Sequence, residues 1–168
     1  MIKTAVDCPT PIAFRYPKSK GVGAKGSGNL KSIAIGQGEL LREGKDALII
    51  AIGSTVYPAL HAAESLKEIG IDAAVINSRF LKPLDKDLIS HWAARTGTVV
   101  TVEENALIGG FGSAVLELFQ EKGLCTIPVR RLGIPDHFIE HGPQSLLRKK
   151  CGIDEAGIVE EVKKMVGK

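Results

Sequence analysis

Residues 101–117 read TVEENALIGGFGSAVLE, and they lead from an apolar strand through a glycine turn into an amphipathic helix. Glycine has no Cβ and tolerates positive φ, so the backbone N–H groups of such a turn lie open at the start of the helix. Gly109 and Gly110, beside the Glu103-Glu104 pair, could therefore hold an anion or accept the backbone of another domain. The simpler interpretation is a tight strand-to-helix turn, since the stretch lacks the GxGxxG spacing and the Lys-Ser/Thr pair of a P-loop.

Short apolar runs alternate with helical periods on both sides of this stretch. The expected strands cover residues 47–52, 73–77, 98–102 and 126–132. The expected helices begin near Val56, at Asp85 and after the glycine turn, and they end at Gly70, Gly97 and Gly123. The run at 47–52 is apolar at every position, which is typical of a strand covered on both faces. Strands that alternate with helices of about 10–15 residues predict right-handed crossovers and a mostly parallel sheet.

Segments outside this alternation are expected to form one more strand and two further helices. Residues 33–41 are expected to form one more strand, and the turn at 43–46 would let it pair antiparallel with the strand that follows. Two closing helices are expected, at residues 145–149 and after Asp154. The predicted fold class is therefore α/β, a three-layer α/β/α arrangement with an about five-stranded, mostly parallel sheet and one antiparallel edge strand.

The beginning of the chain does not follow the alternation. Residues 11–17, PIAFRYP, are typical of a single buried strand that ends at a proline, and residues 18–30 are rich in glycine and lysine. One strand cannot bury its own apolar faces, so residues 1–17 are expected to be the tail of a preceding domain that this chain lacks. The expected division is 1–17 for that tail, 18–30 for a linker and 31–168 for the main domain.

Composition disfavours several classes of protein. The net charge of +3 is scattered along the chain and only 5% of residues are aromatic, so nucleic-acid binding is not expected. No apolar run reaches the roughly 18 residues that span a bilayer. Cys8, Cys125 and Cys151 are far apart and odd in number, which indicates free thiols and a cytoplasmic location. The histidines lack zinc-like spacing with cysteine or carboxylate, so no metal site is expected.

Five segments, taken in order, resemble one known family: AFRYPKSKG at 13–21, AIGSTVYPALHAAESL at 51–66, RFLKPLD at 79–85, TVEENALIGGFGSAVLE at 101–117 and GIPDHFIEHG at 133–142. That family is 1-deoxy-D-xylulose-5-phosphate synthase. The resemblance covers essentially the whole chain, and it implies the tail of the family's pyrimidine-binding domain, a linker and the transketolase-type C-terminal domain. RFLKPLD and the glycine turn also resemble beta subunits of 2-oxoacid dehydrogenases, whereas the RYP segment and PDHFIEHG favour the synthase.

The resemblance implies a transferase that condenses pyruvate with glyceraldehyde 3-phosphate on thiamine diphosphate and Mg²⁺. The products are CO₂ and 1-deoxy-D-xylulose 5-phosphate, a precursor for isoprenoid, thiamine and pyridoxal phosphate synthesis. The family's cofactor-binding residues lie in upstream domains, so this chain is expected to hold no cofactor or metal and to be inactive alone. Its expected role is that of a scaffold that packs against those domains and helps build a homodimer.

Arg15 is the one substrate-binding residue that the resemblance assigns to this chain, where it would bind the phosphate of glyceraldehyde 3-phosphate. A guanidinium suits that task, because its planar fork donates two hydrogen bonds and stays charged. Without the resemblance, an arginine at a strand end that pairs with an acidic neighbour would be the simpler interpretation. No catalytic residue is expected here.

Further candidates are expected at the interface with the neighbouring domain, because open parallel sheets bind their ligands beyond the carboxyl ends of the strands. These candidates are Glu103, Gly109, Gly110, Asp136 and His141. General acid or base roles are a weaker hypothesis, since carboxylates at such places also cap turns or pair with basic residues such as Arg79 and Arg131. Two alternatives stay open: the C-terminal domain of a 2-oxoacid dehydrogenase beta subunit, and a free-standing module that binds an anion or a nucleotide through residues 109–113.

Overall fold

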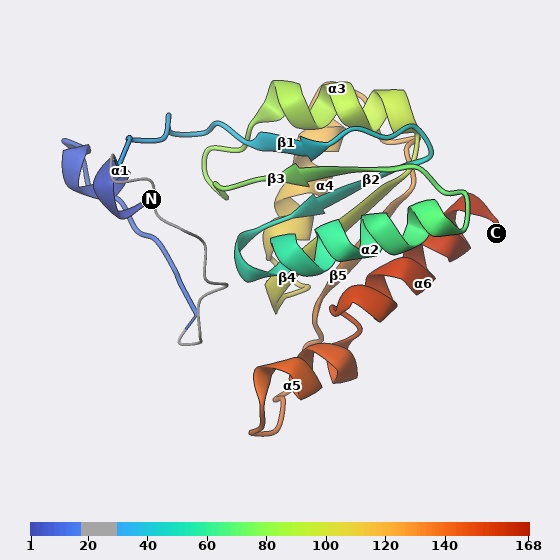
Figure 1. Cartoon of the computed structure of the whole chain (residues 1–168). Helices are drawn as coiled ribbons and strands as arrows, with labels where there is room; N and C mark the ends of the chain where they lie inside the picture. The colour runs from blue at the N-terminus through green and yellow to red at the C-terminus, as the bar shows by residue number, and fades with distance from the viewer. Residues whose placement is uncertain (18–29) are drawn as a thin grey trace.

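The computed structural model describes residues 1–17 and 30–168, and a five-stranded sheet lies at its centre (Figure 1). The strands are β1 (Glu39–Arg42), β2 (Ala47–Ala51), β3 (Ala73–Asn77), β4 (Val99–Ala106) and β5 (Val129–Ile134). Their order in the sheet is β1-β3-β2-β4-β5. All neighbours run parallel except β1, which pairs antiparallel with β3 at one edge.

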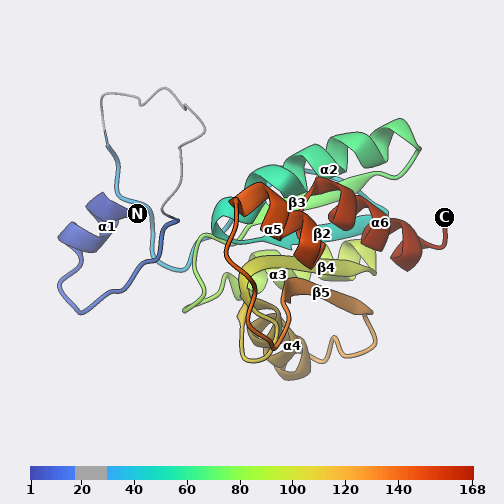
Figure 2. The ribbon, with the colours of Figure 1, turned by 90° about the horizontal axis from the view of Figure 1, so that it is seen from below.

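Helices cover both faces of this sheet. The helices of the described residues are α1 (Ile2–Asp7), the short 3₁₀ helix η1 (Gly53–Thr55), α2 (Val56–Glu68), α3 (Lys86–Thr96), α4 (Phe111–Lys122), α5 (Gln144–Cys151) and α6 (Glu155–Val166), and of these α1 lies apart from the sheet (Figure 1). Figure 2 shows α2 and α6 on one side of the sheet and α3 and α4 on the other. The predicted three-layer fold with a mostly parallel sheet and one antiparallel edge strand is confirmed.

The two hydrophobic layers follow from the alternation of side chains along buried strands. In β2, Ile49 belongs to the cluster beneath α2 and α6, and its neighbour Ile50 belongs to the cluster beneath α3 and α4. All five residues of β2 are fully buried, as expected for a strand with a parallel neighbour on each side. This strand therefore joins the two layers into one core.

Four of the predicted helix ends are confirmed by their capping geometry. The Asp85 side chain accepts a hydrogen bond from the Leu88 N–H at 3.0 Å, and Asp154 accepts one from the Gly157 N–H at 3.0 Å. Gly97 and Gly123 end their helices in the left-handed conformation that glycine adopts without strain. These local signals fix where α3, α4 and α6 begin or end.

The predicted pairing of the edge strand was wrong. The strand covers only Glu39–Arg42, not residues 33–41, and it pairs with β3, not with β2. Both edges of β2 are already taken by parallel strands, and the turn before β2 crosses the start of β3. There the N–H groups of Lys45 and Asp46 both donate to Asp72 O at 2.9 Å, and a Cβ on Gly44 would lie 2.3 Å from backbone atoms of β3.

The predicted strand at residues 11–17 was also wrong, since this segment has no regular secondary structure and is mostly exposed. A strand needs a neighbour for its N–H and C=O groups, and no strand of the described residues pairs with it. The helix α1 precedes it, held to residues 30–38 by a hydrogen bond from the Ile33 N–H to Thr4 Oγ1 at 2.8 Å. The predicted linker at 18–30 lies, except for Leu30, outside the described residues.

Two strand boundaries differ from those expected. The last predicted strand, at 126–132, begins only at Val129, because Pro128 has no N–H to donate to a ladder. The strand predicted at 98–102 continues to Ala106, so Glu103 and Glu104 both lie in β4. None of the helices in the described part of the chain is both long and apolar enough to cross a bilayer.

Candidate functional site

Glu103 lies toward the carboxyl end of β4, and its side chain connects this strand to the first residues of α4. This side chain is only 1% exposed, and its two carboxylate oxygens accept hydrogen bonds from the Phe111 N–H at 2.7 Å and the Gly112 N–H at 2.8 Å. A carboxylate at the N-terminal end of a helix is stabilised by the unpaired N–H groups there and by the helix dipole. Glu103 is therefore the cap of α4.

Gly110 is required by this cap. A Cβ there would lie 2.1 Å from the Ala106 carbonyl oxygen and 2.4 Å from a carboxylate oxygen of Glu103, so any side chain would displace one of them. Gly109 differs, because its φ of +69° favours glycine although the space around it is open. The structure thus brings together three of the predicted residues, Glu103, Gly109 and Gly110.

Three N–H groups of the turn and of the start of α4 donate to side chains of this chain. Besides the two donors to Glu103, the Gly109 N–H donates to Ser113 Oγ at 3.1 Å. Arg131, predicted as a partner for a carboxylate, donates instead to Leu107 O at 2.7 Å and to Ser113 Oγ at 2.9 Å. An anion at the turn would have to compete with Glu103 for its donors. The geometry therefore gives no support to a module that binds an anion or a nucleotide through residues 109–113.

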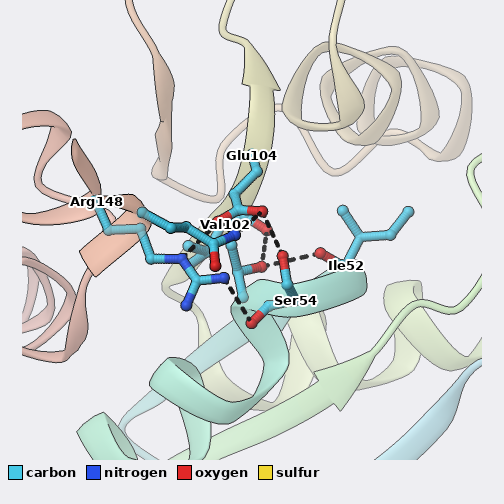
Figure 3. A network of polar contacts seen from close by, with 7 residues as sticks. Ile52, Ser54, Val102, Glu104 and Arg148 are labelled. Atoms are coloured by element: carbon cyan, nitrogen blue, oxygen red, sulfur yellow. Dashed lines mark hydrogen bonds and ion pairs between the residues drawn. The ribbon is translucent and has the colours of Figure 1, made fainter. Parts of the chain in front are cut away.

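The neighbouring carboxylate, Glu104, lies at the centre of a second polar network (Figure 3). Its oxygens accept hydrogen bonds from Arg148 Nε at 2.5 Å, from Gln144 Nε2 at 3.0 Å and from the hydroxyl of Ser54. Arg148 Nη2 also donates to Ser54 O at 3.5 Å. Because Ser54 follows β2, Glu104 lies on β4 and the other two lie on α5, the network anchors α5 to the carboxyl edge of the sheet.

A pocket of 440 Å³ lies beside this network. Its polar lining includes Glu104, Gln144 and Arg148, and its apolar lining includes Ile134 and Leu147. Glu140 is also on its rim, where Lys150 Nζ donates to the carboxylate at 2.7 Å and thereby lowers the pKa of Glu140 below its usual range. The charges at the pocket are thus largely paired with one another.

Arg15 reaches the same edge of the sheet from the N-terminal segment. Its Nη1 donates to Asn105 Oδ1 at 3.4 Å, and Asn105 directly follows the two glutamates on β4. Arg79, the other arginine considered as a carboxylate partner, lies elsewhere and pairs with Glu39 at 2.5 Å. Arg15 lies beside the end of β4 without an acidic partner among the described residues.

Asp136 and His141 are exposed on the segment between β5 and α5. No hydrogen bond or ion pair joins either side chain to the network of Glu104 or to the cap of α4, within the described residues. The structure therefore does not bring these two residues together with the other candidates. Their expected place at a domain interface stays a prediction.

Four residues of this edge were not predicted from the sequence: Ser54, Asn105, Gln144 and Arg148. The signal for Ser54 and Asn105 was present, since each closely follows the end of a predicted parallel strand, and such ends meet at one edge. Gln144 and Arg148 lie four residues apart on one face of α5, but only tertiary packing shows that this face meets Glu104.

The family model described as "Transketolase, C-terminal domain" matches residues 36–158, which is most of the chain. The chain belongs to the transketolase C-terminal domain family. Among curated relatives of this domain, the chain is 58% identical over 158 residues to 1-deoxy-D-xylulose-5-phosphate synthase 1 of Geobacter sulfurreducens, covering 94% of this chain and 25% of that protein. It is 51% identical over 166 residues to 1-deoxy-D-xylulose-5-phosphate synthase of Halothermothrix orenii, covering 99% of this chain and 26% of that protein.

Solved structures agree with this transketolase-type domain. A split-gene transketolase, described as an inactive beta4 tetramer, has a TM-score of 0.75 and 41% identity, covering 82% of this chain and 44% of that one. A transketolase from Pichia stipitis, at 20% identity and a TM-score of 0.53, shares the fold. The chain spans about a quarter of the length of the curated relatives that it matches, and those relatives support the synthase over the 2-oxoacid dehydrogenase alternative.

The described residues of this domain do not fit thiamine diphosphate with Mg²⁺. The cap by Glu103 already uses the helix N–H groups that would suit a diphosphate. No group of three or more His, Cys, Asp or Glu side chains in residues 1–17 and 30–168 is arranged to hold a metal ion. The donors that could contact an anion here are few, and Arg15 is the clearest of them.

Proposed function

We propose that this chain acts as the C-terminal domain of a 1-deoxy-D-xylulose-5-phosphate synthase. The observation that supports this most strongly is the 58% identity with the Geobacter sulfurreducens synthase over nearly the whole chain. The reaction would condense pyruvate with glyceraldehyde 3-phosphate, and other parts of the protein would bind thiamine diphosphate and Mg²⁺. Residues 31–168 would form the domain, with residues 1–17 as the end of the domain before it and residues 18–30 as the linker.

The role of this domain in the reaction is to build and hold one edge of the site. Glu103 and Glu104 fix the end of β4 to α4 and α5, so the backbone there is rigid. Arg15 lies against that end, with its charge available to a phosphate. A charged guanidinium binds phosphate through short, charge-assisted hydrogen bonds, which is how the domain would select a phosphorylated aldehyde.

We also propose that the exposed candidates of this edge lie against neighbouring domains or a second subunit. Asp136, His141 and the surface of the turn at Gly109 are accessible in the domain, so they are free to contact a partner. Such contacts would place the rigid end of β4 beside the cofactor of the whole enzyme. A homodimer and a cytoplasmic location remain predictions.

A chimera tests the proposed function. This chain would replace the matching quarter of the Geobacter sulfurreducens synthase, and formation of 1-deoxy-D-xylulose 5-phosphate would be measured with both substrates and the cofactor. We expect the chimera to turn over and the chain alone to form no product. A folded chimera that binds the cofactor but forms no product, or an isolated chain that does, would overturn the proposal.

Within the active chimera, Arg15→Ala tests the phosphate contact. Loss of a charge-assisted contact costs roughly 1.5–3 kcal/mol, so we expect KM for glyceraldehyde 3-phosphate to rise about 10- to 100-fold. KM for pyruvate should change by less than about twofold, because pyruvate has no phosphate. Equal losses for the two substrates would show that Arg15 has no phosphate-specific role.

A further inference from the structure

The contact between Arg15 and Asn105 joins the N-terminal segment to the end of β4. Among the described residues, Asn105 Oδ1 is the one side-chain partner of this guanidinium, at 3.4 Å. The segment at residues 8–17 belongs to no helix or strand, so its own backbone does little to orient a long side chain. Asn105 is therefore the group best placed to direct Arg15.

The backbone of Asn105 is held in place by hydrogen bonds of the residues on either side of it. On one side, Glu103 is bound to two N–H groups of α4 and Glu104 is bound to α5. On the other side, the Leu107 N–H donates to Ile134 O at 2.9 Å. The Asn105 carbonyl oxygen also packs closely against Gly133, where a Cβ would lie 3.0 Å away. The amide side chain thus projects from a fixed backbone.

The chemistry of an amide suits this task. An amide oxygen accepts a hydrogen bond from a guanidinium and carries no net charge, so it orients Arg15 without neutralising it. A carboxylate at the same place would form an ion pair with Arg15 and compete with a phosphate for its donors. The glutamates before Asn105 cannot compete in this way, because their oxygens are engaged by α4 and α5.

We infer that Asn105 is a positioning residue that orients the Arg15 guanidinium toward the phosphate of the aldehyde substrate. This inference rests on the proposed function, because it needs Arg15 to bind that phosphate. It assigns to the C-terminal domain a direct part in substrate selection, through a side chain that touches Arg15 and not the reacting atoms. The substrate class it selects is a phosphorylated aldehyde, as opposed to an unphosphorylated one.

The test uses the active chimera with Asn105→Ala, Asn105→Asp and Asn105→Gln. For glyceraldehyde 3-phosphate, we expect KM to rise about threefold in the Ala variant, which loses the orientation, and about tenfold or more in the Asp variant. The Gln variant keeps a neutral amide oxygen and should stay closer to the parent than the Asp variant does. KM for pyruvate, kcat and KM for unphosphorylated glyceraldehyde should change by less than about twofold in all three.

A matched control makes the same amide-to-carboxylate change elsewhere. Gln120 is exposed on α4, and Gln120→Glu should leave the kinetics unchanged. In the Arg15→Ala background, Asn105→Asp should cause no further rise in KM for the phosphorylated aldehyde, because the side chain it acts through is gone. An additive effect in that background would contradict the inference.

The possible failures can be told apart. A chimera that forms no product refutes the proposed function. An active chimera in which Arg15→Ala changes both substrates equally refutes the phosphate role of Arg15. If Arg15→Ala is phosphate-specific but the Asp variant is no worse than the Ala variant, or if all Asn105 variants act equally on pyruvate, Asn105 does not position Arg15.

Discussion

At the scale of single residues, the end of β4 shows how two adjacent glutamates come to do different work. Glu103 points into the protein and caps α4, whereas Glu104 points toward α5 and joins Ser54, Gln144 and Arg148. Successive side chains of a strand face opposite sides, so a Glu-Glu pair serves two helices at once. Asn105 then faces Arg15, and the three residues together define the edge of the sheet.

Glu103→Gln tests the cap at this scale. The amide presents an NH₂ group to one of two buried N–H donors, which leaves that donor without an acceptor and removes the negative charge from the helix N-terminus. We expect a loss of about 1–3 kcal/mol in the free energy of unfolding, measured by urea denaturation. Glu117→Gln, an exposed position on the same helix, is the control and should stay within about 0.5 kcal/mol of the parent.

At the scale of elements, the N-caps of α3 and α6 are both aspartates, but their side chains bind different numbers of N–H groups. The side chain of Asp154 binds only the Gly157 N–H of its own helix, among the hydrogen bonds of the described residues. Asp85 binds the Leu88 N–H with one oxygen and, with the other, the Gly38 N–H at 2.9 Å, just before the edge strand β1. Asp85 therefore fastens the edge of the sheet as well as α3.

This difference predicts unequal costs for the two caps. Asp154→Ala should lower the free energy of unfolding by about 1 kcal/mol, as for an ordinary N-cap. Asp85→Ala should cost about 2 kcal/mol, because it also frees the Gly38 N–H. Amide hydrogen exchange would locate the effect: protection of β1 should fall in the Asp85 variant and stay unchanged in the Asp154 variant. Equal losses in the free energy of unfolding for the two variants, with no change in the hydrogen-exchange protection of β1, would argue against this double role of Asp85.

At the scale of the whole molecule, the sheet joins two hydrophobic layers. In the described residues, the layer beneath α2 and α6 and the layer beneath α3 and α4 share the strands of the sheet, whose residues alternate between them. The single tryptophan, Trp92, belongs to the second layer and is 5% exposed, so its fluorescence reports on that layer alone. Ile49 belongs to the first layer and is fully buried.

Ile49→Ala therefore tests whether the layers unfold together. Removing a buried isoleucine costs about 2–5 kcal/mol. We expect the Trp92 fluorescence transition in urea to shift by the same amount as the circular dichroism transition, although the substitution lies on the opposite face. Val6→Ala, in the exposed part of α1, should shift neither transition. Two separate transitions in the Ile49 variant would show that the layers are independent units.

The sequence by itself determined the alternation of strands and helices and most of the helix ends. The fully apolar run of β2, the caps at Asp85 and Asp154 and the terminal glycines at Gly97 and Gly123 are local signals, because each acts through neighbours within a few residues. Family resemblance added the role predicted for Arg15. Of the site, Glu103 and the glycine turn could be identified, although not the cap that joins them.

Only the tertiary structure decided which strand lies beside β1, whether residues 11–17 form a strand, and which side chains meet at the carboxyl edge of the sheet. Strand order depends on which edges of β2 are already taken, and a strand needs a neighbour that no local pattern supplies. Arg148 and Glu104 are 44 residues apart, and Arg15 and Asn105 are 90 apart. Such contacts follow from the packing of whole elements, so the sequence names the residues but not their partners.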